Sequence, residues 1–221
     1  MCGINVIEVS YIHMLCVMLP THQSKKMIKK ITRDISIIKY RNFPLWEVDE
    51  ETDTEYSHFP KTHSHYWVKL SEEDDDRIVE NLASELSKLY DLLGIDELIF
   101  FSSHNMRWIS KYTAKRNDYR PLIKATSYFD KNKLNGKFNG AIKIDKINFQ
   151  EFFKHFIVLT NCDSGFFHNH FLNEKQDILG YVHYSGEVQF SILNQEMNER
   201  FLEKIQTTNF VDTMRENSNR I

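Results

Sequence analysis

The sequence predicts an α+β fold, in which one compact domain holds a mainly antiparallel sheet and three or so packed helices. Two alternating runs, residues 178–184 and 187–193, flank Ser185-Gly186, which is typical of a β-hairpin. Apolar residues recur at helical spacing in three other stretches. Only 7 glycines and 4 prolines occur in 221 residues. We therefore expect residues 27–206 to form one unit, with a subdivision allowed near residues 104–120.

The first 26 residues are expected to be either an N-terminal extension or an edge strand. Val6 and Tyr11 favour a strand, but regular patterning begins only after Lys26, and Met27 offers an alternative start, so we prefer the extension. Glu8 interrupts the apolar stretch, and bases follow it rather than precede it, so we expect neither export nor a membrane anchor. The scattered cysteines fit reduced thiols in a cytoplasmic protein. They are Cys2, Cys16 and Cys162.

Three extended segments are predicted next. Residues 35–40 are interpreted as a strand because of their β-branched isoleucines. Pro44 disfavours helical geometry in the residue before it, so residues 43–48 are expected to be extended. A polar stretch then leads to His65, and residues 66–70 alternate as a short strand.

The clearest predicted helix starts after Ser71, a suitable N-cap, and ends at Gly94. Five acids, residues 72–76, would occupy its first turn, where the helix dipole favours negative charge. Its apolar stripe recurs at steps of three and four residues. The stripe consists of Ile78, Leu82, Leu86, Leu89 and Leu93. The continuous apolar run 98–101 predicts a buried strand.

The last third predicts a short helix capped by Asn148, a strand over residues 157–159, the hairpin and a final helix over 195–205. If Tyr184 pairs with Glu187, two sets of hairpin residues share one face. They are Leu179, Tyr181 and His183, with Val188, Phe190 and Ile192. That register places His183 at the edge of an apolar face. The polar tail from Gln206 is expected to be frayed.

Charge is distributed unevenly along the chain. Residues 46–86 contain 13 acids and 3 bases, a local charge of −10 in a chain whose net charge is −3. The predicted helix accounts for the acids from residue 72 onward, which leaves an acidic loop over residues 47–55. Residues 107–154 reverse the sign, with 12 bases, 4 acids and interleaved aromatics. That pattern can indicate a nucleic-acid surface, but no known binding motif accompanies it, so we interpret it as solvated or complementary surface.

Paired histidines are the strongest indication of chemistry. His168 and His170 are two residues apart, as are His63 and His65, and such a pair on a strand projects from one face. The sequence contains candidate ligands for a metal site, and such a site would make the protein a metal-dependent hydrolase or nuclease. Its ligands would be Cys162, His168, His170 and His183, with Asp163 as a substitute. We prefer ordinary hydrogen-bonded histidines and no cofactor, because the spacing fixes no complete ligand set and no catalytic motif is present.

One segment carries a resemblance to known proteins. It comprises Phe43-Pro44-Leu45-Trp46-Glu47, Asp49-Glu50-Glu51 and Tyr66-Trp67-Val68-Lys69. Residues 35–70 thus resemble small bacterial proteins with an F-P-x-W-E segment, an acidic stretch and a W-V-x-P strand, which in turn resemble immunity partners of secreted polymorphic toxins. Two departures are Leu70 in place of the proline and His63-Ser64-His65-Tyr66 in place of an acidic pair.

The resemblance implies a binding role, so no catalytic residue carries over. We expect the acidic loop to contact a protein toxin, such as one with a basic active site that acts on nucleic acid, and not a membrane or nucleic acid itself. Complementary charge would speed association. The predicted contact residues are Asp49, Glu50, Glu51, Asp53, Glu55 and Tyr56. Trp46 and Trp67 could anchor the partner or lie in the core, and for Trp46 we favour the core.

Overall fold

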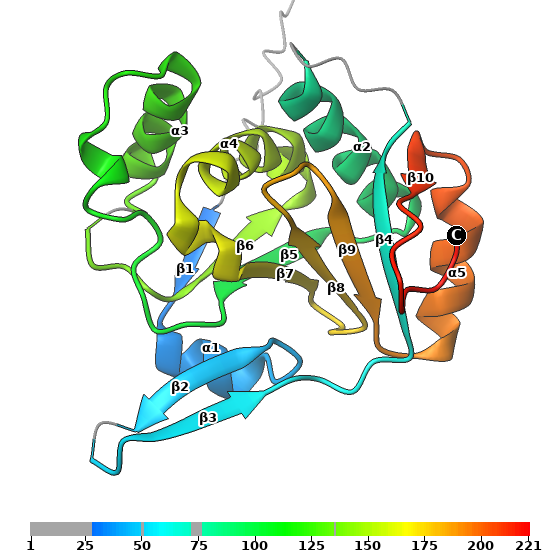
Figure 1. Ribbon diagram of the computed structural model, residues 1–221, viewed down its shortest axis with the longest axis horizontal. Helices are drawn as coiled ribbons and strands as arrows, with labels where there is room; N and C mark the ends of the chain where they lie inside the picture. Colours follow the sequence, from blue (N-terminus) through cyan, green and yellow to red (C-terminus); the bar gives the residue numbers. More distant parts are fainter. Residues whose placement is uncertain (1–27, 50, 72–76, 135) are drawn as a thin grey trace, which may run out of the picture.

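The computed structural model describes residues 28–49, 51–71, 77–134 and 136–221 (Figure 1). Within these ranges the α-helices are α1 (Arg33–Lys39), α2 (Ile78–Leu92), α3 (Arg120–Lys131), α4 (Phe149–Cys162) and α5 (Gln195–Ile205). The strands are β1 (Ile28–Ile31), β2 (Leu45–Asp49), β3 (Thr54–His58), β4 (Ser64–Leu70), β5 (Glu97–Ser102), β6 (Ala141–Asp145), β7 (Asn169–Asn173), β8 (Ile178–Val182), β9 (Val188–Ile192) and β10 (Phe210–Asp212). The leading segment, residues 1–26, lies outside the described residues.

Eight of the strands form one sheet in the order β1-β6-β5-β7-β8-β9-β4-β10. Every neighbouring pair is antiparallel. The other two described strands, β2 and β3, pair with each other in a separate two-stranded sheet, and Trp46 of β2 also forms an isolated parallel bridge with His104. The predicted α+β class with a mainly antiparallel sheet is confirmed, although the described residues form five helices rather than three or so.

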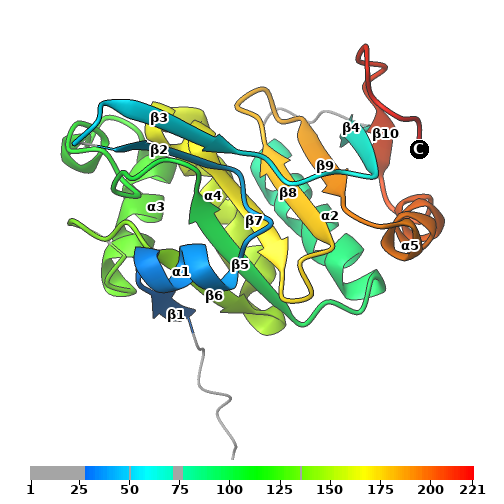
Figure 2. The ribbon, with the colours of Figure 1, turned by 90° about the horizontal axis from the view of Figure 1, so that it is seen from below.

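The two faces of the large sheet are covered differently. Helices α2, α3 and α4 lie over one face, and α1 and the β2–β3 hairpin lie over the other (Figures 1 and 2). The helix-covered face buries a dense aromatic core, in which the ring of Phe100 lies 4.5 Å from that of Phe152 and 5.3 Å from that of Phe171. The opposite face has a smaller apolar cluster around Tyr40 and Phe43. We call the part of this face that α1 does not cover the helix-free face. It includes the half-buried side chains of His65, Trp67, Tyr181 and Gln189 on β4, β8 and β9.

The predicted strand over residues 35–40 is wrong, because this segment forms α1. Arg33, Ser36 and Tyr40 recur at helical spacing and are buried. The Ser36 hydroxyl donates to the Thr32 carbonyl at 2.7 Å. Of the β-branched residues that suggested a strand, Ile35 and Ile38 face outward, with Ile38 69% exposed, and Ile37 packs against the apolar cluster. Because two of the buried residues, Arg33 and Ser36, are polar, the apolar residues of this segment show no helical period.

The segment 157–159, predicted as a strand, continues α4 to Cys162. Helix α4 is covered by α2 and α3 on its flanks and by the sheet below (Figure 1), so most of its residues are buried. A short apolar run cannot distinguish a buried helix from a buried strand. Asn148 does precede the helix, but its side chain makes no capping hydrogen bond, so that part of the prediction is wrong.

The body of α2 and its end at Gly94, where φ is +65°, are confirmed. Its start is not at Ser71: the helix begins at Ile78 with Arg77 as its N-cap. The five acids 72–76 lie outside the described residues. The final helix over residues 195–205 and the extended segments 43–48, 66–70 and 98–101 are confirmed as α5, β2, β4 and β5.

The hairpin at residues 178–193 exists, but its predicted register is wrong by one residue. Val182 pairs with Val188, and the His183 amide donates to the Glu187 carbonyl at 2.8 Å. The loop therefore has three residues and ends at Gly186, whose φ is +85°. A shift of one residue exchanges the faces of a strand. Tyr181 consequently shares its face with Gln189, and not with Val188 or Phe190.

The C-terminal tail is ordered rather than frayed. Residues 210–212 form β10 on the free edge of β4. The Thr213 amide donates to the Trp67 carbonyl at 3.0 Å, and the Asn219 amide donates to the His65 carbonyl at 2.7 Å. The Arg215 guanidinium lies 4.0 Å from the Trp67 ring. The tail thus supplies the last strand of the sheet and covers part of its helix-free face.

Candidate functional site

The acidic segment of the sequence folds into the β2–β3 hairpin. Its pairing runs from Leu45 opposite His58 to Asp49 opposite Thr54. The polar stretch before His65 therefore contains a strand, β3, that the sequence analysis missed, since its residues show no apolar alternation. All five residues of β3 are exposed. In Figure 1 the hairpin lies below the sheet and its turn points away from the helices.

The base of the hairpin is fixed to the body through Arg33. This buried guanidinium donates to the carbonyls of Ser102 and Ser103, at 3.2 and 3.5 Å, and to the Glu47 carboxylate at 3.2 Å. Burial lowers the pKa of Arg33, although Glu47 opposes that shift. The Trp46 amide also donates to the Ser103 carbonyl at 2.8 Å. Glu47 therefore has a structural partner and anchors the hairpin.

The structure places most of the predicted contact residues on the hairpin surface. Glu51, Asp53, Glu55 and Tyr56 are exposed, the last by 58%. Asp49 is the last residue of β2. Its side chain lies outside the described part of the chain, as does the whole of Glu50.

Two more aromatic rings are exposed on or directly after the hairpin, although the register places Trp46 on the opposite face of the ribbon from Tyr56. Trp46, which we expected in the core, is 40% exposed and stacks on His104 with ring centroids 5.8 Å apart. Phe59, which follows β3 directly, is 66% exposed, and the sequence analysis did not single it out. The sequence offered one signal for Phe59, since it is an isolated apolar residue in a polar stretch, directly before Pro60. Trp67 lies half-buried elsewhere, on the sheet face under Arg215.

The metal site imagined from the sequence is not assembled. Among the described residues, no three His, Cys, Asp or Glu side chains are grouped so that they could hold a metal ion. Cys162, a free thiol at the end of α4, packs against the helix-side core. His170 lies on the other side of the sheet, and His183 bonds locally to Ser185 at 2.6 Å. Asp163 accepts hydrogen bonds from the amides of Ser110 and Gly165, which gives it a structural role.

Histidines nevertheless gather on the helix-free face. The rings of His104 and His168 are 3.8 Å apart, and His170 lies 5.2 Å from Tyr181. Burial lowers the pKa of His104 and of His168. Burial, together with these two neighbours, lowers the pKa of His170 to about 3. Burial also lowers the pKa of His65. These imidazoles are therefore neutral near pH 7.

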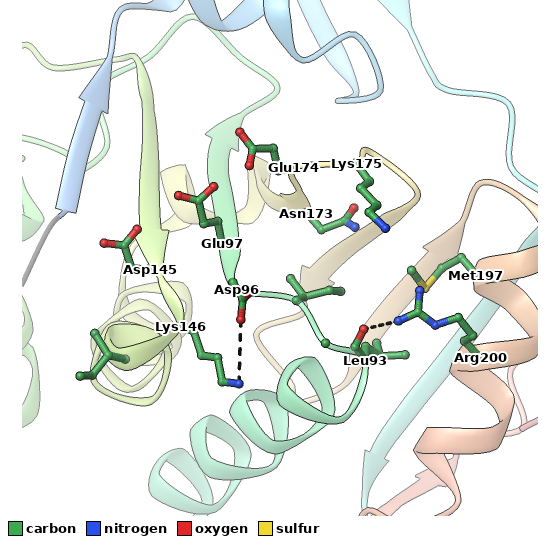
Figure 3. Close-up of a pocket in the computed structure, with 13 residues that line it drawn as sticks. Leu93, Asp96, Glu97, Asp145, Lys146, Asn173, Glu174, Lys175, Met197 and Arg200 are labelled. Carbon is green, nitrogen blue, oxygen red and sulfur yellow. Dashed lines mark hydrogen bonds and ion pairs between the residues drawn. The ribbon is translucent and has the colours of Figure 1, made fainter.

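A cavity of about 580 Å³ lies at one end of the sheet, and several of its charged groups already have partners (Figure 3). Lys146 forms ion pairs with Asp91 and Asp96. Arg200 donates to the Leu93 carbonyl. Asn173, also in the wall, holds the following turn by accepting from the Asp177 amide at 3.0 Å. We interpret this cavity as a structural ion-pair network that joins α2 and α5 to the sheet.

The basic segment 107–154 does not present its aromatic residues as one surface. Trp108 is buried, and its indole nitrogen donates to the Gly140 carbonyl at 2.8 Å. Tyr128 is half-buried and stacks on His155 with centroids 4.2 Å apart. Only Tyr112 and Tyr119 of the four are exposed. Stacking on bases requires accessible rings, so this arrangement does not favour a nucleic-acid interface.

Comparison with known proteins gives no assignment: no family model, no curated protein and no solved structure matches this chain. Within the described ranges, no helix has the length and apolar character needed to cross a bilayer.

Proposed function

We propose that this chain is a non-enzymatic binding protein of the bacterial immunity type, which neutralises a protein toxin through the β2–β3 hairpin. The observation that carries the proposal is the exposure of the whole β3 strand beside acidic and aromatic side chains. Protein interfaces favour aromatic anchors surrounded by polar groups. Here Tyr56 on one face of the hairpin and Trp46 on the other, with Phe59 directly after β3, would be the anchors around the exposed edge of β3, and Asp53 and Glu55 the charged rim.

The backbone of the hairpin supports the same role. Strand β2 is tied on its outer side to residue 103, whereas no main-chain hydrogen bond in the described part of the chain joins β3 to any strand except β2. An exposed strand edge can pair with a strand of a partner. The anchor at Arg33 holds this edge in place before the partner arrives, which lowers the entropic cost of binding.

The charge of the hairpin suits a toxin whose active site is basic. A negative surface attracts such a partner over long range and raises the association rate at low salt. Binding over a basic groove would exclude a polyanionic substrate such as nucleic acid. Neutralisation therefore requires only association, without any chemistry in this chain.

The test is co-expression with any secreted protein whose gene lies beside that of this chain, followed by measurement of binding and of cell survival. We expect a stable complex and protected cells. In the variant D53N/E55Q the association rate should fall about tenfold at low salt. The matched control is E196Q/E199Q on α5, where both side chains are also exposed. Equal association rates for the two variants, or no protection by the unaltered protein, would reject the proposal.

A further inference from the structure

A second cavity, of about 400 Å³, lies on the helix-free face of the sheet. Strands β4, β7, β8 and β9 contribute to it, and the chain that follows β3 closes one side. Its polar lining consists of Thr62, His65, His170, Tyr181, Gln189 and Ser191. Its apolar lining consists of Pro44, Phe59, Pro60 and Leu179. A volume of this size is typical of small-molecule sites.

No Asp, Glu, Lys or Arg appears among the described residues that line this cavity, although 27% of the chain is charged. The two histidines in the wall, His65 and His170, have lowered pKa values because of burial. The cavity is therefore electrically neutral near pH 7. An anion or cation placed there would lose its hydration without gaining a counter-charge.

Part of the polar lining has no partner within the described chain. The Nδ1 atom of His170 is buried without a hydrogen bond. The hydroxyl of Tyr181 and the side-chain amide of Gln189, both on half-buried residues, make no hydrogen bond with any other described residue. Buried polar groups are normally paired. Three residues that line this cavity thus carry polar atoms without a hydrogen-bond partner among the described residues.

The neighbouring groups are already paired and rigid. His65 contacts the Thr62 hydroxyl through Nε2 at 2.7 Å and the Ser191 hydroxyl through Nδ1 at 3.0 Å. This chain of hydrogen bonds fixes the imidazole at the floor of the cavity. The contrast between His65, which is fully paired, and His170, which is not, distinguishes structural polar groups from those available to a ligand.

We propose that this cavity binds an uncharged, planar heterocycle of nucleobase or nucleoside size. The rings of Phe59 and Tyr181 offer flat apolar surfaces for such a molecule. His170, Tyr181 and Gln189 supply both donors and acceptors, which a heterocycle with mixed polarity would satisfy. Phe59 lines this cavity and also belongs to the proposed toxin-binding surface, but the acidic side chains of the hairpin do not line the cavity, so binding of the heterocycle can be tested without a toxin.

The test is titration of the isotope-labelled full chain with adenosine, uridine and nicotinamide, observed through the imidazole NMR signals of His65 and His170. At least one probe should shift both signals saturably, with a dissociation constant below about 1 mM. Adenosine monophosphate carries the same base with a charged phosphate, and it should bind at least about tenfold more weakly than adenosine. Absence of any shift, or equal binding of nucleoside and nucleotide, would overturn the proposal.

Two pairs of variants connect the binding to the named groups. Y181F and Q189L each remove one unused polar group and should weaken the best probe about fivefold, the usual effect of one hydrogen bond. Y112F and Q206L make the same chemical changes at exposed positions and should leave the affinity unchanged. The backbone amide spectrum shows whether each variant is folded. Unaltered affinity in the folded double variant Y181F/Q189L would also overturn the proposal.

Discussion

The two faces of the eight-stranded sheet use the same strands for different purposes. On β7, Phe171 points into the aromatic core under the helices, whereas its neighbour His170 lines the cavity on the opposite face. On β8, a Cβ atom at Gly180 would come within 2.2 Å of the Phe171 ring, while Tyr181 beside it has an unused hydroxyl. The helix-covered face is thus filled to its limit, and the other face keeps space and hydrogen-bonding capacity. Stability and binding can change separately in such a protein.

The largest expected effect comes from emptying the helix-covered face. Phe153 is fully buried, with its ring 5.1 Å from Phe171 and 5.4 Å from Phe100. Phe153→Ala should lower the free energy of unfolding by about 3–5 kcal/mol, because it creates a cavity in a rigid core. Urea denaturation measures this change. The matched variant Phe59→Ala, at an exposed ring, should change it by less than about 0.5 kcal/mol. Similar losses for the two variants would remove the distinction between the faces.

The next effect concerns Arg33, the buried cation that joins the hairpin to the sheet. Arg33→Met leaves the Ser102 and Ser103 carbonyls and the Glu47 carboxylate without their donor, and should cost about 2 kcal/mol. Hydrogen exchange should show lost protection in β2 and β3 ahead of the rest of the molecule. Arg41→Met is the control, since the exposed Arg41 side chain has one hydrogen bond within the described part of the chain, to the Ile38 carbonyl. Unchanged protection in the Arg33 variant would show that the hairpin is held by other contacts.

A helix or strand was predicted correctly from the sequence where its own residues carry the signal. Helices α2 and α5 and strands β4 and β5 were predicted because their own residues carry the period. Helix α1 was not, since Arg33, Ser36 and Tyr40 are its buried residues while two of its three isoleucines, Ile35 and Ile38, face solvent. Strand β3 was not, because a strand exposed on every residue has no alternation. The predicted fold class is therefore correct although several single helices and strands were predicted wrongly.

The cavity was not predicted from the sequence, because the predicted register of the β8–β9 hairpin was wrong by one residue. Pairing Tyr184 with Glu187 put Tyr181 on the face of Phe190, which is the core face, whereas the actual pairing puts it beside Gln189. His65 reaches this site from β4, which lies beside β9 only in the folded chain. No local pattern encodes either contact. A three-residue turn that ends at Gly186 would have been the one readable clue.

Protonation offers a smaller and reversible way to disturb the helix-free face. The pKa of His170 is about 3 in the folded protein, below the ordinary value of 6.5. The unfolded chain therefore binds this proton first, and its contribution to stability is present above pH 6.5 and is lost as the pH falls toward 3. The free energy of unfolding should fall by up to about 1 kcal/mol per pH unit. His170→Gln, which cannot titrate, should reduce the slope, while exposed His63→Gln should not. Equal slopes in both variants would contradict this role.

The smallest expected effect on stability belongs to the hairpin acids. Asp53 and Glu55 are exposed, and substitutions at such positions usually change the free energy of unfolding by less than about 0.5 kcal/mol. D53N/E55Q should therefore melt like the unaltered protein, as should the control E196Q/E199Q. The two variants should differ only in how fast they associate with a basic partner, and that difference should disappear in high salt. A drop in stability specific to D53N/E55Q would mean that these acids hold the hairpin turn together, and slow binding would then report a damaged hairpin rather than a lost charge.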